Sequence, residues 1–298
     1  MIMNSKIKRA VKNPNKTVKG LYWKMDQYVG KTLFGNTVGL KHNILGKMNL
    51  VENSSFKSDD PIIKQFRKNG FLDLGIKFDE SLIDKIRIKY NKMIEDDKFS
   101  FGSGGIANEK YFKRQIINPQ FNIPEVESIL NEEIINYVQC YYGGNFHVVR
   151  VDLWRIYHIP EKYQNSDLIS NRWHCDNRKT DRLKLFVNLS DVSEKDGPLH
   201  LQSIPRTKEL MKMKFNNRLD YGIPDEVMED PKYVVRCIGP AGSTFFANTT
   251  TCLHKAGNPQ NTRDIIQLLF RSSKEPFDKD WINRVIHVGP DQLDTIEE

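Results

Sequence analysis

The sequence predicts a mainly β fold with flanking helices, namely a double-stranded β-helix of the jelly-roll, cupin-like kind. Short runs rich in β-branched and aromatic residues recur between positions 146 and 272, and glycine-containing turns separate them. Two stretches before position 145 have helical spacing instead. With 298 residues, the chain is long enough for one such domain with a sizeable core.

The helical part of this prediction rests on start and stop signals. Asp60 and Pro61 offer an N-cap followed by a first-turn proline, and Gly70 offers a left-handed C-cap, so a short helix lies between them. Residues 79–93 and 124–142 place apolar side chains at mostly helical intervals. We expect these helices to pack on the sheet.

The strand part rests on apolar runs bounded by turns. Residues 148–157 form the first expected strand, and residues 183–189 form a buried one. Further strands are expected at 232–236, 244–247 and 265–270, and a helical insertion at 206–230. The glycine-rich turn at 101–105 lacks the Gly-Lys-Ser/Thr ending of a phosphate loop, so we interpret it as a plain loop or lid.

Charge divides the chain into two parts. Residues 1–50 contain ten Lys or Arg and one acidic residue, whereas the remainder is nearly neutral. We therefore predict a basic N-terminal extension at 1–58 and one domain, large enough for an enzyme, at 59–298. Its core strands are expected at about 146–272 and its C-terminal tail at 273–298. Such an extension is able to bind nucleic acid or another polyanion, but a solvated Lys-rich segment explains it more simply.

Composition argues against several classes of protein. The 39% hydrophobic and 28% charged residues are typical of a soluble domain, and no apolar run approaches the length of a spanning helix. The N-terminus lacks the apolar core of a secretory signal, and the four cysteines show no CxxC spacing. We expect a cytoplasmic protein. The sequence leaves the oligomeric state open.

The chemistry centres on His174-Cys175-Asp176 and on His254 about eighty residues later. In an extended segment, residues two apart share a face, so His174 and Asp176 project together while Cys175 points away. With a second imidazole from a later strand, two histidines and one carboxylate can occupy one side of a metal. This is the ligand set of non-haem Fe(II) oxygenases.

Four further residues are candidates for the cofactor pocket. Arg263 opens a strand nine positions after His254, and its guanidinium could bind the far carboxylate of 2-oxoglutarate in bidentate fashion. Gln267 shares its face by alternation, Thr250 precedes the distal histidine, and Lys184 lies in the buried strand. Each of these four is also an acceptable structural residue. Four further side chains are expected to border the pocket, namely Trp154, Arg155, Tyr157 and Trp173.

The ordered set of motifs resembles the phytanoyl-CoA dioxygenase-like family of Fe(II)/2-oxoglutarate oxygenases over roughly residues 60–272. The matching segments are Ile63–Phe71, Leu185–Val192 with Asp196–Leu199, and Ala241–Phe246 with Leu253-His254. One departure lies at Ser203–Thr207, where the family usually has Pro-Gly-Ser-His. The missing histidine leaves the three metal ligands intact.

The resemblance implies an oxygenase that uses Fe(II), 2-oxoglutarate and O2, with ascorbate as the reductant in vitro. We expect it to hydroxylate a small metabolite, lipid or natural product and to release succinate and CO2. Desaturation or ring closure by the same centre stays an alternative, as does a non-catalytic jelly roll that binds a metal or small ligand. Nothing in the sequence selects the substrate.

Overall fold

The molecule is described here by a computed structural model that covers residues 59–103, 111–176, 182–215, 222–273, 275–278 and 280–281. The basic extension expected at 1–58, and with it any polyanion site, lies outside the described residues, as does most of the tail. No helix among the described residues is long and apolar enough to cross a membrane.

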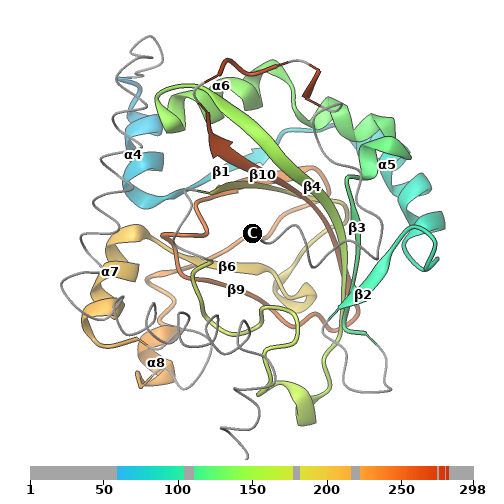
Figure 1. Cartoon of the computed structure of the whole chain (residues 1–298). Helices are drawn as coiled ribbons and strands as arrows, with labels where there is room; N and C mark the ends of the chain where they lie inside the picture. Colours follow the sequence, from blue (N-terminus) through green and yellow to red (C-terminus); the bar gives the residue numbers. More distant parts are fainter. Residues whose placement is uncertain are drawn as a thin grey trace, which may run out of the picture. The chain divides into compact units, whose positions relative to one another are not determined.

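Two antiparallel sheets form the architecture (Figure 1). The large sheet has seven strands in the order β1-β8-β5-β10-β4-β3-β2, and the small sheet has three in the order β7-β6-β9. The strands are β1 (Phe71–Ile76), β2 (Phe101–Ser103), β3 (Lys113–Ile117), β4 (Phe146–Tyr157), β5 (Leu183–Asn188), β6 (Leu199–Gln202), β7 (Val234–Arg236), β8 (Ser243–Ala247), β9 (His254–Ala256) and β10 (Thr262–Ser272). The predicted strands are confirmed, and the glycine-rich turn at 101–105 begins as the edge strand β2.

The described helices are α4 (Pro61–Asn69), α5 (Glu80–Met93), α6 (Glu132–Tyr142), α7 (Ile204–Lys212) and α8 (Asp225–Met228). Asp60 caps α4 by accepting from the Ile62 amide at 2.7 Å, and Gly70 ends the helix at φ 81°. A side chain at Gly70 would also collide with Cys252 Sγ, so both conformation and space require glycine.

The helix expected at 124–142 is in fact two helices. Residues Pro124–Ile129 form a 3-10 helix, and α6 begins only after Asn131. The Asn131 side chain accepts from the Ile134 amide at 3.0 Å, which is an N-cap and therefore a new helix start. Ser203 likewise caps α7, so the segment that departs from the family pattern begins a helix.

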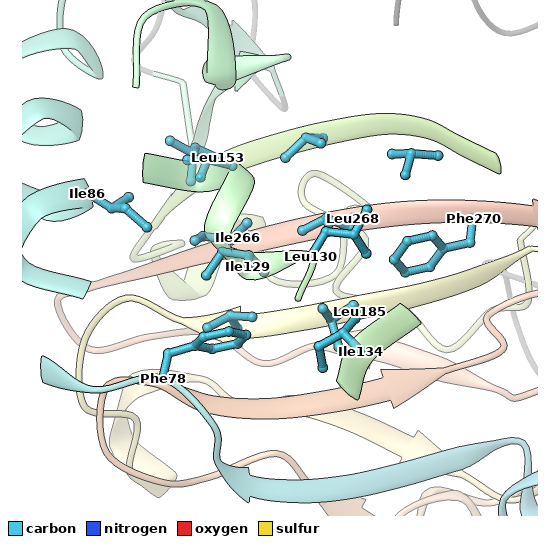
Figure 2. Packing of buried hydrophobic residues seen from close by; sticks show 14 of the residues in the cluster. Phe78, Ile86, Ile129, Leu130, Ile134, Leu153, Leu185, Ile266, Leu268 and Phe270 are labelled. Carbon is cyan, nitrogen blue, oxygen red and sulfur yellow. The ribbon is translucent and has the colours of Figure 1, made fainter. Parts of the chain in front are cut away.

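The large sheet has two faces with different partners. On its outer face, residues such as Leu185, Ile266 and Phe270 pack against α5, α6 and their neighbouring turns (Figure 2). On its inner face, Phe186 and Ile265 pack with Leu199 and Leu201 of the small sheet. The space between the two sheets is therefore the interior of the barrel, and side chains alternate between it and the helical layer.

Candidate metal centre

His174 and His254 lie opposite each other in a short antiparallel bridge. The His174 amide donates to the His254 carbonyl at 3.0 Å, and the His254 amide donates back at 2.9 Å. Directly opposite residues project to the same side, and the two ring centroids are 4.1 Å apart. Backbone pairing thus brings together two imidazoles that are eighty residues apart in sequence.

Both imidazoles present the same nitrogen to the site. Nδ1 of His174 lies 2.7 Å from the Arg172 carbonyl, and Nδ1 of His254 lies 3.2 Å from the Cys252 carbonyl. A proton on Nδ1 satisfies each carbonyl, which leaves the Nε2 lone pair free. Backbone acceptors of this kind orient histidine ligands at metal sites.

Asp176 completes the set. Its Oδ1 atom lies 3.6 Å from His174 Nε2 and 3.7 Å from His254 Nε2, and one ligand atom from each residue falls within 4.8 Å of the others. The Asp176 amide donates to the Thr249 carbonyl at 2.8 Å, which fixes the segment after the bridge. Cys175, by contrast, is buried in a separate apolar cluster with Trp173. Cys175 thus points away as alternation predicted, and the expectation that Trp173 borders the pocket is wrong.

Burial and a neighbouring charge set the protonation of Asp176 and His254. Burial alone would raise the pKa of Asp176, but the charge of Lys184 outweighs it and holds that pKa well below its usual value. Burial lowers the pKa of His254 well below its usual value, so this imidazole is neutral. A carboxylate and a neutral imidazole are the forms that bind metal, so the donor set fits a divalent cation.

Lys184 joins the centre through the second carboxylate oxygen. It lies on the inner face of β5, and its Nζ is 2.7 Å from Asp176 Oδ2. Because Oδ2 faces Lys184, Oδ1 alone faces the histidines. Lys184, which was predicted to border the pocket, therefore lies beside a candidate metal ligand.

Arg263 lies on the inner face of β10, opposite Ile156, and is 3% exposed. Its Nη1 donates to the Gly197 carbonyl, and its Nε has no partner among the described residues. No described carboxylate forms an ion pair with it, and burial lowers its pKa to about 10. The guanidinium therefore stays charged at neutral pH, in a buried place that lacks an anion.

The other two cofactor candidates have protein partners. Gln267 is on the inner face, and its Nε2 donates to Asp152 Oδ2 at 3.0 Å. Thr250 lies in the turn before β9, and its hydroxyl donates to Asn248 Oδ1 at 2.6 Å. Thr250 thus helps to shape the turn that leads to His254.

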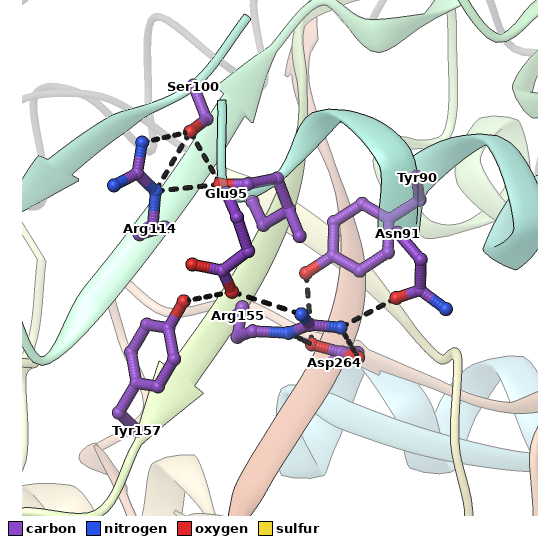
Figure 3. A network of polar contacts seen from close by, with 9 residues as sticks. Tyr90, Asn91, Glu95, Ser100, Arg114, Arg155, Tyr157 and Asp264 are labelled. Carbon is purple, nitrogen blue, oxygen red and sulfur yellow. Dashed lines mark hydrogen bonds and ion pairs between the residues drawn. The ribbon is translucent and has the colours of Figure 1, made fainter. Parts of the chain in front are cut away.

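Arg155 and Tyr157 were expected near the pocket, and that expectation is wrong. Both lie on the outer face of β4, in a polar network with α5 (Figure 3). Arg155 pairs with Asp264 at 2.8 Å, and Tyr157 donates to Glu95 at 2.6 Å. Because side chains alternate along β4, Trp154 points inward, whereas Arg155 and Tyr157 point outward.

Inner-face residues with free polar atoms include Trp154, which was expected near the pocket, and Asn188 and Asp152, which were not. Trp154 Nε1 and Asn188 Nδ2 are buried donors without a partner among the described residues, and Asp152 carries a free carboxylate oxygen. The alternation of side chains within 146–157 and 183–188 places these residues on one face of each strand. It could not be used before the inward face of each strand was known.

No protein-family model matches the sequence, and no curated protein matches it. Solved structures do. The non-haem α-ketoglutarate-dependent carbocyclase SnoK from nogalamycin biosynthesis aligns with a TM-score of 0.53 at 14% identity, over 78% of this chain and 92% of that one. EctD from S. alaskensis in its apoform gives 0.51 at 13% identity, over 72% and 79%. HygX from Streptomyces hygroscopicus, with nickel, 2-oxoglutarate and hygromycin B bound, gives 0.50 at 11% identity, over 72% and 88%.

Identities this low establish the fold and nothing finer. Two antiparallel sheets enclose a barrel interior, helices cover the outer face of the large sheet, and the candidate ligands sit on the short bridge that precedes β5 and on β9. The chain therefore has the double-stranded β-helix fold that the sequence predicted.

Proposed function

We propose that this protein is an Fe(II)/2-oxoglutarate-dependent oxygenase that hydroxylates a small molecule. The observation that carries the proposal is the meeting of His174, Asp176 and His254 in a barrel that also buries an anion-free arginine. Two imidazoles and one carboxylate suit ferrous iron and leave positions for other ligands. Neighbours named as α-ketoglutarate-dependent enzymes support the same chemistry.

Iron bound by these residues would couple oxidative decarboxylation of 2-oxoglutarate to oxidation of a C–H bond, with succinate and CO2 as co-products. The protein's part is to hold and orient. The backbone carbonyls behind both histidines fix the direction of Nε2, and Lys184 restrains Asp176 so that one oxygen faces the metal position.

Arg263 is the proposed anchor for the distal carboxylate of 2-oxoglutarate. A dicarboxylate would supply the anion that this buried guanidinium lacks. Trp154 Nε1 and Asn188 Nδ2 lie on the same face, two residues along the ladder from Arg263, and are further donors for the cosubstrate. A non-catalytic barrel has no need for this grouping of a metal set with unpaired donors.

Asp176 favours oxygen transfer over halide transfer. A carboxylate there would take a ligand position that a halide would need, and its negative charge would disfavour a second anion beside the metal. We expect turnover in high chloride to give no chlorinated product by mass spectrometry. A chlorinated product from the wild type would contradict the ligand role of Asp176.

Ring closure is the second candidate reaction, because the neighbour SnoK is named a carbocyclase. Product mass separates the two, since hydroxylation adds one oxygen atom and ring closure removes two hydrogens. The narrower assignment to the phytanoyl-CoA dioxygenase-like family is also a proposal. It rests on the motifs at 185–199 and 241–254.

The deciding experiment measures succinate released from 2-oxoglutarate under Fe(II), ascorbate and O2. Wild-type protein should release succinate, and the amount should rise with an accepted substrate. His174→Ala combined with His254→Ala should release none. Equal succinate from the wild type and the double variant would show that the reaction does not use this centre.

A further inference from the structure

A second polar group lies on the inner face of the barrel, separate from the metal ligands. Asp152 of β4 and Gln267 of β10 are directly opposite each other, and both side chains are fully buried. Asp152 Oδ2 accepts from Gln267 Nε2 at 3.0 Å and from Arg150 Nε at 3.0 Å. These contacts fix both side chains in place.

Each of the two side chains keeps one atom without a partner among the described residues. These atoms are Asp152 Oδ1 and Gln267 Oε1. The amide orientation of Gln267 follows from its contact, because Nε2 must be the atom that donates to a carboxylate. Both free atoms are therefore hydrogen-bond acceptors, and buried acceptors are rarely left unpaired in a folded protein.

Strand register places this pair next to the metal centre. Arg150, Leu269 and Lys184 are opposite one another across β4, β10 and β5, and Lys184 contacts Asp176. Asp152 and Gln267 lie in the next such row of the same face, roughly 7 Å along the strands. The row beyond holds Trp154 and Asn188, and Arg263 follows it.

The unpaired donors and the unpaired acceptors therefore lie in different rows along the barrel. The rows nearer Arg263 offer donors, which suit the distal carboxylate of 2-oxoglutarate. The row of Asp152 and Gln267 offers acceptors, which would repel a carboxylate. Gln267 was expected to contact the cosubstrate, but its free oxygen suits a donor instead.

We propose that Asp152 and Gln267 bind a hydrogen-bond-donating group of the substrate, an amine or a hydroxyl, next to the reacting carbon. This inference rests on the proposed oxygenase function and narrows its substrate class. Arg150 already pairs with Asp152, so the group need not carry a positive charge. A fatty acyl chain has no N–H or O–H near its oxidisable carbons and would leave both acceptors unpaired.

Gln202 provides a matched control for Gln267. It is also fully buried, its Nε2 donates to the Met228 carbonyl at 2.7 Å, and its Oε1 likewise lacks a partner among the described residues. It lies on β6 next to Leu201, which faces the barrel, so Gln202 faces the other way toward α8. Gln202→Met therefore makes the same chemical change outside the barrel.

The test measures binding of three probes to the full-length protein by ligand-observed NMR, with and without Zn(II) and 2-oxoglutarate. Methyl glucoside offers only hydroxyl donors, cyclohexylamine offers only an amine, and methyl octanoate offers no donor. We expect one of the first two to bind, which identifies the donor. Gln267→Met should weaken that binding at least about tenfold, as loss of one hydrogen bond to a polar ligand does.

Asp152→Asn should have a similar effect, and it supplies a second variant if Gln267→Met folds poorly. Gln202→Met should bind the probe as the wild type does. Three results would overturn the inference: methyl octanoate as the tightest probe, no binding of either donor probe, or unchanged binding in Gln267→Met.

Succinate release separates this inference from the proposed function. If methyl octanoate alone raises succinate release above the level without substrate, the oxygenase assignment holds and the substrate class is wrong. If no compound gives succinate while a donor probe binds through Gln267, the binding site holds and the oxygenase assignment fails.

Discussion

Replacing Arg263 with methionine should make the protein more stable without 2-oxoglutarate and less stable with it. The guanidinium is almost fully buried, its Nε is unpaired, and no described carboxylate balances its charge. Such a group costs folding free energy until an anion binds. Methionine fills a similar volume without a charge, so the two states of the site should respond in opposite directions.

The size of the effect follows from burial. Burial lowers the pKa of Arg263 from 12.5 to about 10, and at 1.36 kcal/mol per pKa unit this corresponds to a cost of about 3 kcal/mol. Loss of the hydrogen bond to the Gly197 carbonyl offsets about 2 kcal/mol of the gain. The net stabilisation of Arg263→Met is then about 1 kcal/mol, or roughly 2–4 °C in Tm.

With 2-oxoglutarate at one hundred times its Kd, a binding-competent protein gains about 2.7 kcal/mol. Wild-type protein loaded with Ni(II) should show this gain, and Arg263→Met should not, so their order of stability reverses. Thermal unfolding with and without 2-oxoglutarate measures both effects. Arg271→Met is the control, because Arg271 lies on the same strand and its Nε is also unpaired among the described residues.

Two results would refute this reasoning about Arg263. The first is an equal rise in Tm with 2-oxoglutarate in the wild type and Arg263→Met. The second is a metal-free, cosubstrate-free Arg263→Met that unfolds several degrees below the wild type, which would mean that the guanidinium holds the barrel together.

Three other predictions concern the metal centre and its surroundings. His174→Ala and His254→Ala should each lose stoichiometric iron after anaerobic loading, and full iron content in the double variant would rule out this ligand set. Lys184→Met should lower the metal-free free energy of unfolding by about 3 kcal/mol, because the carboxylate that Lys184 pairs with loses its counter-charge. Ni(II) should restore most of that loss in urea denaturation, and no restoration would argue against metal binding there. Burial, assisted by the charge of Lys255, lowers the pKa of His200 to about 4, so His200 is neutral when folded but protonates below about pH 6.5 when unfolded. Its stabilising contribution is therefore complete above pH 6.5 and falls by up to about 3 kcal/mol as the pH drops to 4. His200→Gln should lose stability less steeply over that range, and parallel pH profiles would contradict the assignment.

The candidate metal ligands could be predicted from sequence because their geometry is local. His174 and Asp176 share a face in any extended segment, whatever the rest of the chain does. The helix caps depend on equally local contacts, because Asp60 and Gly70 end α4 through hydrogen bonds within a few residues. His254 needed the additional match of an apolar strand and a glycine turn before it, and β9 then placed it opposite His174.

Residues on the long strands could not be placed in the same way, because alternation gives two faces and does not say which one turns inward. Polar residues in 146–157 fall at odd positions (His147, Arg155) and at even positions (Arg150, Asp152), so both assignments look alike. Arg155 was therefore placed in the pocket, although it lies outside with Asp264. Which face turns inward depends on the small sheet and the helices, which pack against the strands from opposite sides.

The pairing of Asp152 with Gln267 shows what decides such cases. The two residues are 115 positions apart, and they are opposite each other only in the register that β4 and β10 adopt. That register shifts at a bulge between Leu269 and Phe270, so counting from the end of β10 that lies beyond the bulge would pair the wrong residues. Local spacing in the sequence can therefore indicate which side chains are candidate metal ligands. Which polar groups face the barrel interior depends on a long-range register, and local sequence patterns do not give that register.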